Sequence, residues 1–120
     1  MSAPATSPSV SLVIPIFNEE DVIPELLARL QSLFAAQPGE SWEVVFVNDG
    51  SRDRSADLLR AQEAADARFR LLELSRNFGF QAAIAAARAH ARGAAIVTMD
   101  ADLQDPPELI PELIAAWRGG

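Results

Sequence analysis

Four short apolar runs, separated by segments with helical periodicity, constrain the fold of this chain more than any other feature. The runs are VSLVIPIF (10–17), WEVVFVN (42–48), FRLLELS (69–75) and AAIVTMD (94–100). Each has the length of a strand, and its apolarity is continuous instead of alternating. Because continuous apolarity is typical of strands covered on both faces, the runs predict a buried parallel sheet.

The segments that follow these runs have helical signals. From Ile23 onward, apolar residues recur with a period of about 3.6. Ser51 or Asp53 can cap a second helix. The Ala-rich segment 81–93 predicts a third helix that lies very close to the sheet, and Asp105, followed by two prolines, opens a fourth. This order of strands and helices predicts an α/β fold with right-handed crossovers.

The composition fits one globular domain and excludes several classes of protein. The 120 residues are 49% hydrophobic and 22% charged, as in a folded chain. The net charge of −7 argues against a nucleic-acid-binding face. No apolar run approaches the roughly 20 residues of a transmembrane helix. Cysteine is absent, which excludes disulfides and thiolate metal sites and agrees with a cytoplasmic location.

We expect residues 1–9 to be a disordered lead-in and residues 10–120 to form the domain. The lead-in, MSAPATSPS, has neither the basic nor the apolar segment of a signal peptide. The chain stops at WRGG soon after its last helical segment, which we interpret as truncation of a larger domain. Truncation would leave an exposed sheet edge, so we also expect a tendency to form homo-oligomers.

Polar residues gather at the point where each predicted strand ends. In an open α/β sheet, the carboxyl ends of parallel strands meet at one edge, and ligands bind outside that edge. The sequence therefore predicts a ligand site there. The polar residues concerned are Asn18, Glu19, Glu20, Asn48, Asp49, Ser51, Ser75, Arg76, Asn77, Asp100 and Asp102.

The turn after the first strand argues against an ordinary dinucleotide site. Such a site has G-x-G-x-x-G in this turn, so that backbone amides approach a pyrophosphate. Here the turn has Asn18, Glu19 and Glu20, and the two carboxylates would repel phosphate. A nucleotide can still bind through its base and ribose if a divalent cation screens its diphosphate.

Asp100 and Asp102 are the candidate metal ligands. They are two residues apart, so their side chains share one face of an extended segment, and Gln104 joins them if the chain stays extended. Carboxylate and amide oxygens suit Mg²⁺ or Mn²⁺. From these residues alone, a solvated acidic turn is the alternative to a metal site.

Other polar residues also have two interpretations. Residues 49–51 form either a turn with a cap or part of the site. Arg76 either neutralises the acidic residues or contacts a ligand phosphate. Asn77 and Gly79 are most simply turn formers. The only histidine, His90, is expected to be solvated, and no Ser-His-Asp arrangement is evident.

Four segments together resemble the family-2 nucleotide-sugar glycosyltransferases of the GT-A fold. They are VIPIFNEE (13–20), VVFVNDGSRDRS (44–55), LSRNFGFQAA (74–83) and MDADLQDPPELI (99–110). The pattern is most similar to the bacterial polyprenyl-phosphate glycosyltransferases, relatives of dolichol-phosphate mannose synthase. The resemblance implies a Rossmann-like nucleotide-binding half with a parallel sheet of about four strands and flanking helices.

The resemblance also implies roles for individual residues in binding the nucleoside. Pro15, Phe17 and Glu19 match the segment that lines the nucleoside pocket. Val47 and Asp49 match the residues that hold the base.

A metal site is implied in the same way. Asp100, Ala101 and Asp102 match the Asp-x-Asp motif, in which the second Asp contacts the metal and the first lies nearer the nucleotide. Gln104 matches a further metal ligand. The implied reaction uses Mg²⁺ or Mn²⁺, a UDP- or GDP-sugar donor and a polyprenyl-phosphate acceptor, and it inverts the anomeric carbon. No catalytic base is identified, and UDP is favoured over GDP by the resemblance alone.

The chain departs from the family pattern at two residues and in extent. Asn48 replaces an acid, and Phe80 replaces a polar residue. The acceptor-binding half, a third acidic site and membrane helices have no counterpart, so we expect a donor-binding fragment that is inactive alone. The intact protein would act in the cell envelope, at the cytoplasmic face of the membrane.

A catalytically silent nucleotide-binding module is the alternative function for this chain. A Mg²⁺-binding receiver domain is disfavoured because the chain has no lysine.

Overall fold

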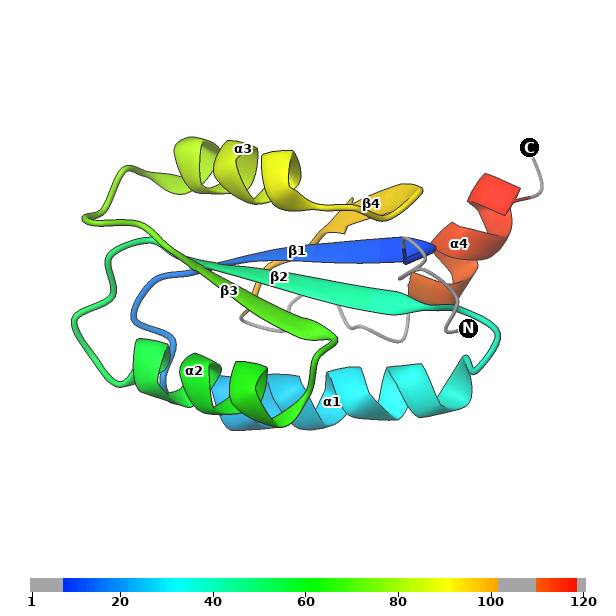
Figure 1. Ribbon diagram of the computed structural model, residues 1–120, viewed down its shortest axis with the longest axis horizontal. Coiled ribbons are helices and arrows are strands. Elements are labelled where there is room, and N and C mark those ends of the chain that lie inside the picture. Colours follow the sequence, from blue (N-terminus) through cyan, green and yellow to red (C-terminus); the bar gives the residue numbers. More distant parts are fainter. Residues whose placement is uncertain (1–7, 102–109, 119–120) are drawn as a thin grey trace, which may run out of the picture.

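Strands and helices alternate along the chain, as the sequence predicts. The computed structural model describes residues 8–101 and 110–118 (Figure 1). The elements are β1 (Val10–Ile16), α1 (Ile23–Ala36), β2 (Trp42–Asn48), α2 (Ser55–Ala65), β3 (Phe69–Glu73), α3 (Phe80–His90), β4 (Ala95–Thr98) and α4 (Ile110–Arg118). The predicted opening of the fourth helix at Asp105 lies outside the described residues.

The four strands form one parallel sheet in the order β3-β2-β1-β4. The central strands are β2 and β1, and Val10 of β1 lies opposite Trp42 of β2 and Ala95 of β4. The chain runs from β1 outward to β3 and then returns to β4 on the other side of β1. The strand order therefore reverses between β1 and β4, and in open α/β sheets ligands bind beside such a reversal.

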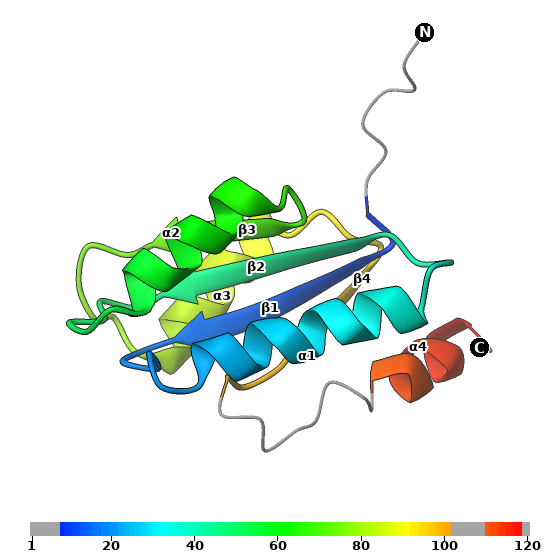
Figure 2. The same ribbon diagram turned by 90° about the horizontal axis from the view of Figure 1, so that it is seen from below.

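Helices cover the two faces of the sheet in separate layers. Figures 1 and 2 show α1 and α2 on one face and α3 on the other. Helix α4 belongs to the α1 side, because its Ile110 and Ile114 share a core cluster with Leu26 and Leu30 of α1. A change of face on the return to β4 gives all the crossovers the same hand, as the right-handed crossover rule requires.

The larger part of the core lies between the sheet and α1. Leu26 and Leu30 of α1 are fully buried, and Phe46 of β2 is 1% exposed. Phe34 stacks on Trp42 with ring centroids 5.1 Å apart. Since each fully buried large apolar side chain stabilises the fold by roughly 1.5–3 kcal/mol, this layer fixes the sheet against α1.

A smaller core lies between the sheet and α3. Ala83 and Ala87 of α3 are fully buried in one cluster with Val13, Val45 and Val47. Small residues on this helix face let it lie directly on the valines, as the Ala-rich sequence predicts. Val47, one of the residues expected to hold a base, is 0% exposed and belongs to this core.

The expectation that all four strands are covered on both faces is correct for β1 and β2. It is wrong for β3, where only Phe69 is buried, and for β4. Every residue of β1 and β2 is buried, whereas burial alternates along β4, where Ile96 is 39% exposed. Ile96 lies opposite Ser11, and Thr98 opposite Val13, so both are on the α3 face. Helix α3 lies over β1 and β2 and leaves this side of the edge strand open.

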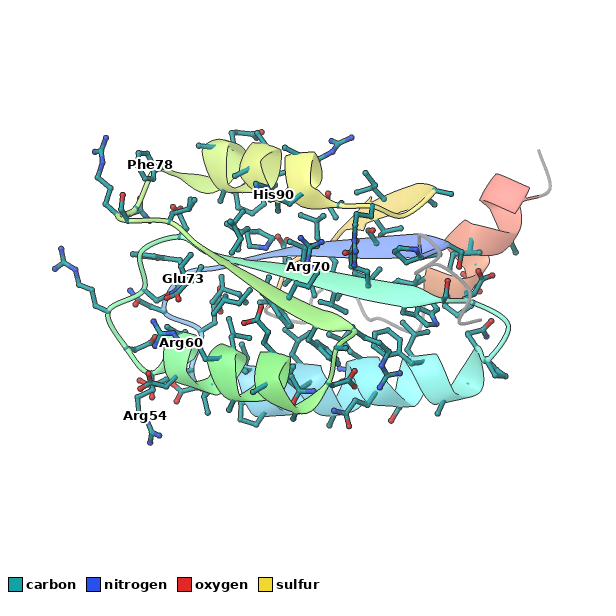
Figure 3. All side chains as sticks on the ribbon, in the orientation of Figure 1. Arg54, Arg60, Arg70, Glu73, Phe78 and His90 are labelled. Atoms are coloured by element: carbon teal, nitrogen blue, oxygen red, sulfur yellow. The ribbon has the colours of Figure 1, made fainter. Side chains whose placement is uncertain are left out.

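A buried carboxylate, that of Glu43, connects the amino-terminal ends of the strands. Glu43 is 2% exposed and accepts hydrogen bonds from the Ser11 hydroxyl (2.6 Å), the Arg92 backbone N–H (2.9 Å) and the Arg70 guanidinium. Arg70 also donates to the carbonyl of His90 at the end of α3 (Figure 3). Burial raises the pKa of Glu43, but the hydrogen bonds from Ser11, Arg92 and Arg70 outweigh it and lower the pKa to about 2.

Candidate functional site

A cavity of about 440 Å³ opens at the carboxyl edge of the sheet. Segments at the ends of all four strands contribute to its lining, and these include β1 and β4, between which the strand order reverses. Its position is therefore the one that the strand order predicts for a ligand site.

The cavity brings together most of the residues expected to bind a nucleotide-sugar. Six of the expected residues line the cavity: Pro15, Phe17, Glu19, Asp49, Asp100 and Ala101. Val47 is not among them, because its side chain is packed under α3. Asp102 and Gln104, the expected metal ligands, lie outside the described residues.

Besides Ile16 at the end of β1, three further described residues line the cavity: Asn77, Gly79 and Phe80. The sequence favours Asn77 and Gly79 as turn formers, and Gly79 does adopt a left-handed φ of 98°. Phe80 is 50% exposed at the start of α3. The sequence does contain one signal that Asn77, Gly79 and Phe80 belong to the site. All three lie in LSRNFGFQAA, one of the four segments on which the family resemblance rests.

Asp49 connects the end of β2 to the β3–α3 loop (residues 74–79). Its Oδ1 accepts the backbone N–H of Phe78 at 2.8 Å, and its Oδ2 accepts that of Gly79 at 3.1 Å. The Asn77 amide donates to the same Oδ2 at 3.3 Å. Asp49 is only 4% exposed, so its carboxylate replaces water as the partner of this loop. The side chain is therefore neither a simple cap nor a freely solvated acid.

The backbones of these two segments are also in direct contact at Gly50. This residue has a φ of 77°, which favours glycine. A Cβ atom here would lie 2.5 Å from the backbone nitrogen of Asn77 and 2.6 Å from the carbonyl carbon of Arg76. Only glycine lets the β2–α2 loop (residues 49–54) approach the β3–α3 loop so closely.

The β1–α1 turn (residues 17–22) has its first backbone amides already occupied. The N–H groups of residues 18–20 each donate to a side chain within residues 51–55, over distances of 2.9, 2.9 and 3.1 Å. In a dinucleotide-binding fold the corresponding amides face a pyrophosphate. Here the same amides donate to side chains of the protein itself.

Arg76 makes a contact that neither of its two sequence interpretations includes. Its guanidinium lies 4.4 Å from the ring centroid of Phe78, in a cation–π contact at the surface. Arg76 also lines a neighbouring groove of about 580 Å³ together with Arg60 and Glu73. In that groove Arg60 donates to Glu73 over 2.6 Å, and Figure 3 shows these two residues where the carboxyl end of β3 lies beside α2.

The cavity combines exposed aromatic rings with carboxylates. Phe17 and Phe80 present exposed aromatic rings, and Glu19 and Asp100 add carboxylates. Within residues 8–101 and 110–118, no group of three His, Asp or Glu side chains is placed to hold a metal by itself.

None of the helices within the described part of the chain is both long enough and apolar enough to cross a membrane.

The sequence model of the family described as Glycosyl transferase family 2 matches residues 11–120. One relative, the uncharacterised glycosyltransferase YkcC of Bacillus subtilis (strain 168), is 51% identical to this chain over 110 residues. That match covers 92% of this chain and 34% of YkcC. The undecaprenyl-phosphate 4-deoxy-4-formamido-L-arabinose transferase of Salmonella paratyphi B is 45% identical over 107 residues, which cover 88% of this chain and 32% of the transferase.

Solved structures show the same fold. The mannosyltransferase PcManGT from Pyrobaculum calidifontis, in complex with GDP-Man and Mn²⁺, matches with a TM-score of 0.69 and 25% identity over 85% of this chain and 34% of its own. TarS 1–349 of S. aureus, in complex with UDP, matches with a TM-score of 0.68 and 25% identity over 87% of this chain and 32% of its own. The chain spans about a third of the length of the relatives it matches.

Proposed function

The chain belongs to glycosyl transferase family 2, and we propose that it forms the donor-binding part of an enzyme that transfers a sugar from a nucleotide-sugar to a polyprenyl phosphate. The observation that carries the proposal is the cavity at the carboxyl edge, which gathers Phe17, Glu19, Asp49 and Asp100 from the ends of three strands. The solved structure of PcManGT contains GDP-Man and Mn²⁺, and that of TarS contains UDP. Both support a nucleotide-sugar as the donor.

The nucleoside would occupy the part of the cavity beside the β1–α1 turn. Pro15 and Phe17 offer apolar surface there, and Phe80 adds a second aromatic ring to the lining. Asp49 already accepts three hydrogen bonds, but a carboxylate has about four acceptor positions, so one remains for a base N–H. A uracil or a guanine can supply that donor.

The diphosphate would point toward the segment that follows β4. We propose that Asp102 and Gln104 hold Mg²⁺ or Mn²⁺, with Asp100 and Ala101 nearer the nucleotide. Their oxygens are of the type these ions prefer. When bound, the ion would screen the diphosphate and stabilise the nucleoside diphosphate as it leaves. The acidic residues of the cavity would otherwise repel the donor.

The reaction that fits this donor site is a direct displacement with inversion. An oxygen of the acceptor phosphate would form a bond to the anomeric carbon while the bond from that carbon to the nucleoside diphosphate breaks. An ionised phosphate is already a nucleophile, so we assign no general base. The Salmonella relative, whose name specifies undecaprenyl phosphate, supports the proposed class of acceptor. The intact protein would then meet its acceptor at the cytoplasmic face of a membrane.

The chain alone would bind the donor without transferring it, because it spans about a third of its relatives. The test offers UDP-glucose and GDP-mannose to the folded chain with Mn²⁺ and undecaprenyl phosphate in detergent micelles. We expect binding of one nucleotide-sugar by equilibrium dialysis and no glycolipid in the extract. Glycolipid formation would contradict the inactivity of the fragment. Failure to bind either nucleotide-sugar would contradict the proposed function of this cavity.

A further inference from the structure

We infer that residues 48–55 position the β1–α1 turn, so that Ser51, Asp53 and Ser55 act on the cavity through Phe17 and Glu19 and do not contact a ligand themselves. None of these three is among the described residues that line the cavity. The inference rests on the proposed function only where it concerns nucleotide affinity.

The first contact joins Asn18 to the β2–α2 loop in both directions. The backbone N–H of Asn18 donates to the Ser51 hydroxyl at 2.9 Å, and the Asn18 side-chain oxygen accepts the backbone N–H of Arg52 at 2.8 Å. Asn48 in turn accepts the backbone N–H of Ser51 at 3.1 Å. These bonds hold Asn18 at a φ of 53°, a left-handed conformation that asparagine tolerates better than most residues.

The second contact involves the next two amides of the turn. The N–H of Glu19 donates to the hydroxyl of Ser55 at 2.9 Å, and that of Glu20 to Oδ2 of Asp53 at 3.1 Å. Oδ1 of Asp53 accepts the N–H of Ser55 at 2.9 Å, and Ser55 is fully buried. Burial raises the pKa of Asp53, but hydrogen bonds from Ser55 and Glu20 outweigh it and hold the pKa below its usual value.

Three successive amides are therefore fixed by side chains more than 30 residues away in the sequence. Phe17 directly precedes these amides and Glu19 is one of their residues, and both line the cavity. Phe17 is 45% exposed, so packing alone does not fix its ring. Loss of one acceptor would release the turn toward water and let this wall of the cavity move.

The test uses Ser51→Ala, which removes the acceptor of the Asn18 amide. Ser51→Thr keeps the hydroxyl and is the rescue variant. The matched control is Ser9→Ala, because Ser9 accepts a backbone N–H from Ser41 at 2.9 Å beside the amino-terminal edge of the sheet. Each folded variant is measured for hydrogen exchange of the Asn18 amide, for the Phe17 ring resonances and for the Kd of whichever nucleotide, UDP or GDP, binds with Mn²⁺.

We expect Ser51→Ala to speed exchange at Asn18, to shift the Phe17 resonances and to raise the nucleotide Kd by about tenfold. Ser51→Thr and Ser9→Ala should leave all three unchanged. Unchanged exchange at Asn18, or faster exchange with an unchanged Kd, would overturn the inference. If the wild type binds neither nucleotide, the proposed function fails, and the Phe17 resonances decide instead: a shift in Ser51→Ala alone supports the positioning role, and no shift overturns it.

Discussion

The Asp49 carboxylate accepts the backbone N–H of Phe78 over 2.8 Å, which ties the end of β2 to the loop that follows β3. These residues are 29 positions apart in the chain. The bond is one of a set through which the segment after β2 holds both of its neighbouring loops. The walls of the cavity are thus fixed by polar contacts between loops, above a sheet fixed by apolar packing.

Replacement of Asp49 should loosen the β3–α3 loop. Asp49→Ala leaves the N–H groups of Phe78 and Gly79 without their acceptor, which should lower the free energy of unfolding by about 1–3 kcal/mol. Asp49→Asn keeps one acceptor oxygen and should lose less. Urea denaturation followed by tryptophan fluorescence measures both, and equal losses in the two variants would contradict the role of the carboxylate as acceptor.

A methyl group at Gly50 should be poorly tolerated. Gly50→Ala forces alanine to a φ of 77° and brings its Cβ to 2.5 Å from the Asn77 nitrogen, so we expect a loss of at least about 2 kcal/mol. The control is Gly39→Ala, where no atom lies within 4 Å of the added Cβ. That variant should change stability by less than about 1 kcal/mol. Similar thermal midpoints for the two variants would show that the loops are not in close contact.

Helix α3 should reject a larger side chain on its inner face. Ala87 is fully buried against the valines of β1 and β2, so Ala87→Leu should cost about 1–3 kcal/mol through overpacking. Ala82 is on the same helix and is exposed, and Ala82→Leu should be nearly neutral. Chemical denaturation of the two variants side by side measures the difference. A neutral Ala87→Leu would mean that α3 does not lie directly on the sheet.

Glu43 should make stability depend on acid pH. Its pKa falls from 4.5 to about 2 on folding, so its contribution is fully present above pH 4.5 and is lost as the pH falls toward 2. The shift corresponds to about 3 kcal/mol. The difference in unfolding free energy between the wild type and Glu43→Gln should therefore shrink between pH 5 and pH 2.5.

The control for that titration is Glu25→Gln, which removes an exposed carboxylate from α1. Its difference from the wild type should stay small across the same range. A Glu43→Gln difference that is constant with pH would contradict the buried, hydrogen-bonded state of this carboxylate.

The fold could be predicted from the sequence where burial is two-sided. Continuous apolar residues in β1 and β2 predict central strands, and both are buried throughout. The same pattern in β4 misleads, because Ile96 is apolar but lies on an edge strand that α3 does not cover. Edge position depends on strand order, and a run of apolar residues does not encode strand order.

Without the family resemblance, the site could be predicted only as a set of strand ends. That principle brings Glu19, Asp49 and Asp100 to one cavity. The principle does not predict which polar groups form hydrogen bonds within the protein and are therefore not available to a ligand. Asp53 is expected to cap α2, but the N-cap position is Arg54 and no side-chain cap hydrogen bond forms there. Asp53 lies one residue earlier and accepts the N–H of Ser55 together with that of Glu20 from another turn. Such contacts between loops depend on tertiary geometry.

The most direct test of the donor site is calorimetric titration of UDP and GDP into the chain, with and without Mn²⁺. The wild type is compared with Asp102→Ala, and Asp105→Asn is the control from the same acidic segment. We predict Mn²⁺-dependent binding of one nucleotide, its loss in Asp102→Ala and its retention in Asp105→Asn. Absence of binding by a folded wild-type chain, or equal binding by Asp102→Ala, would contradict the assignment of this edge of the sheet as a metal-dependent nucleotide-sugar site.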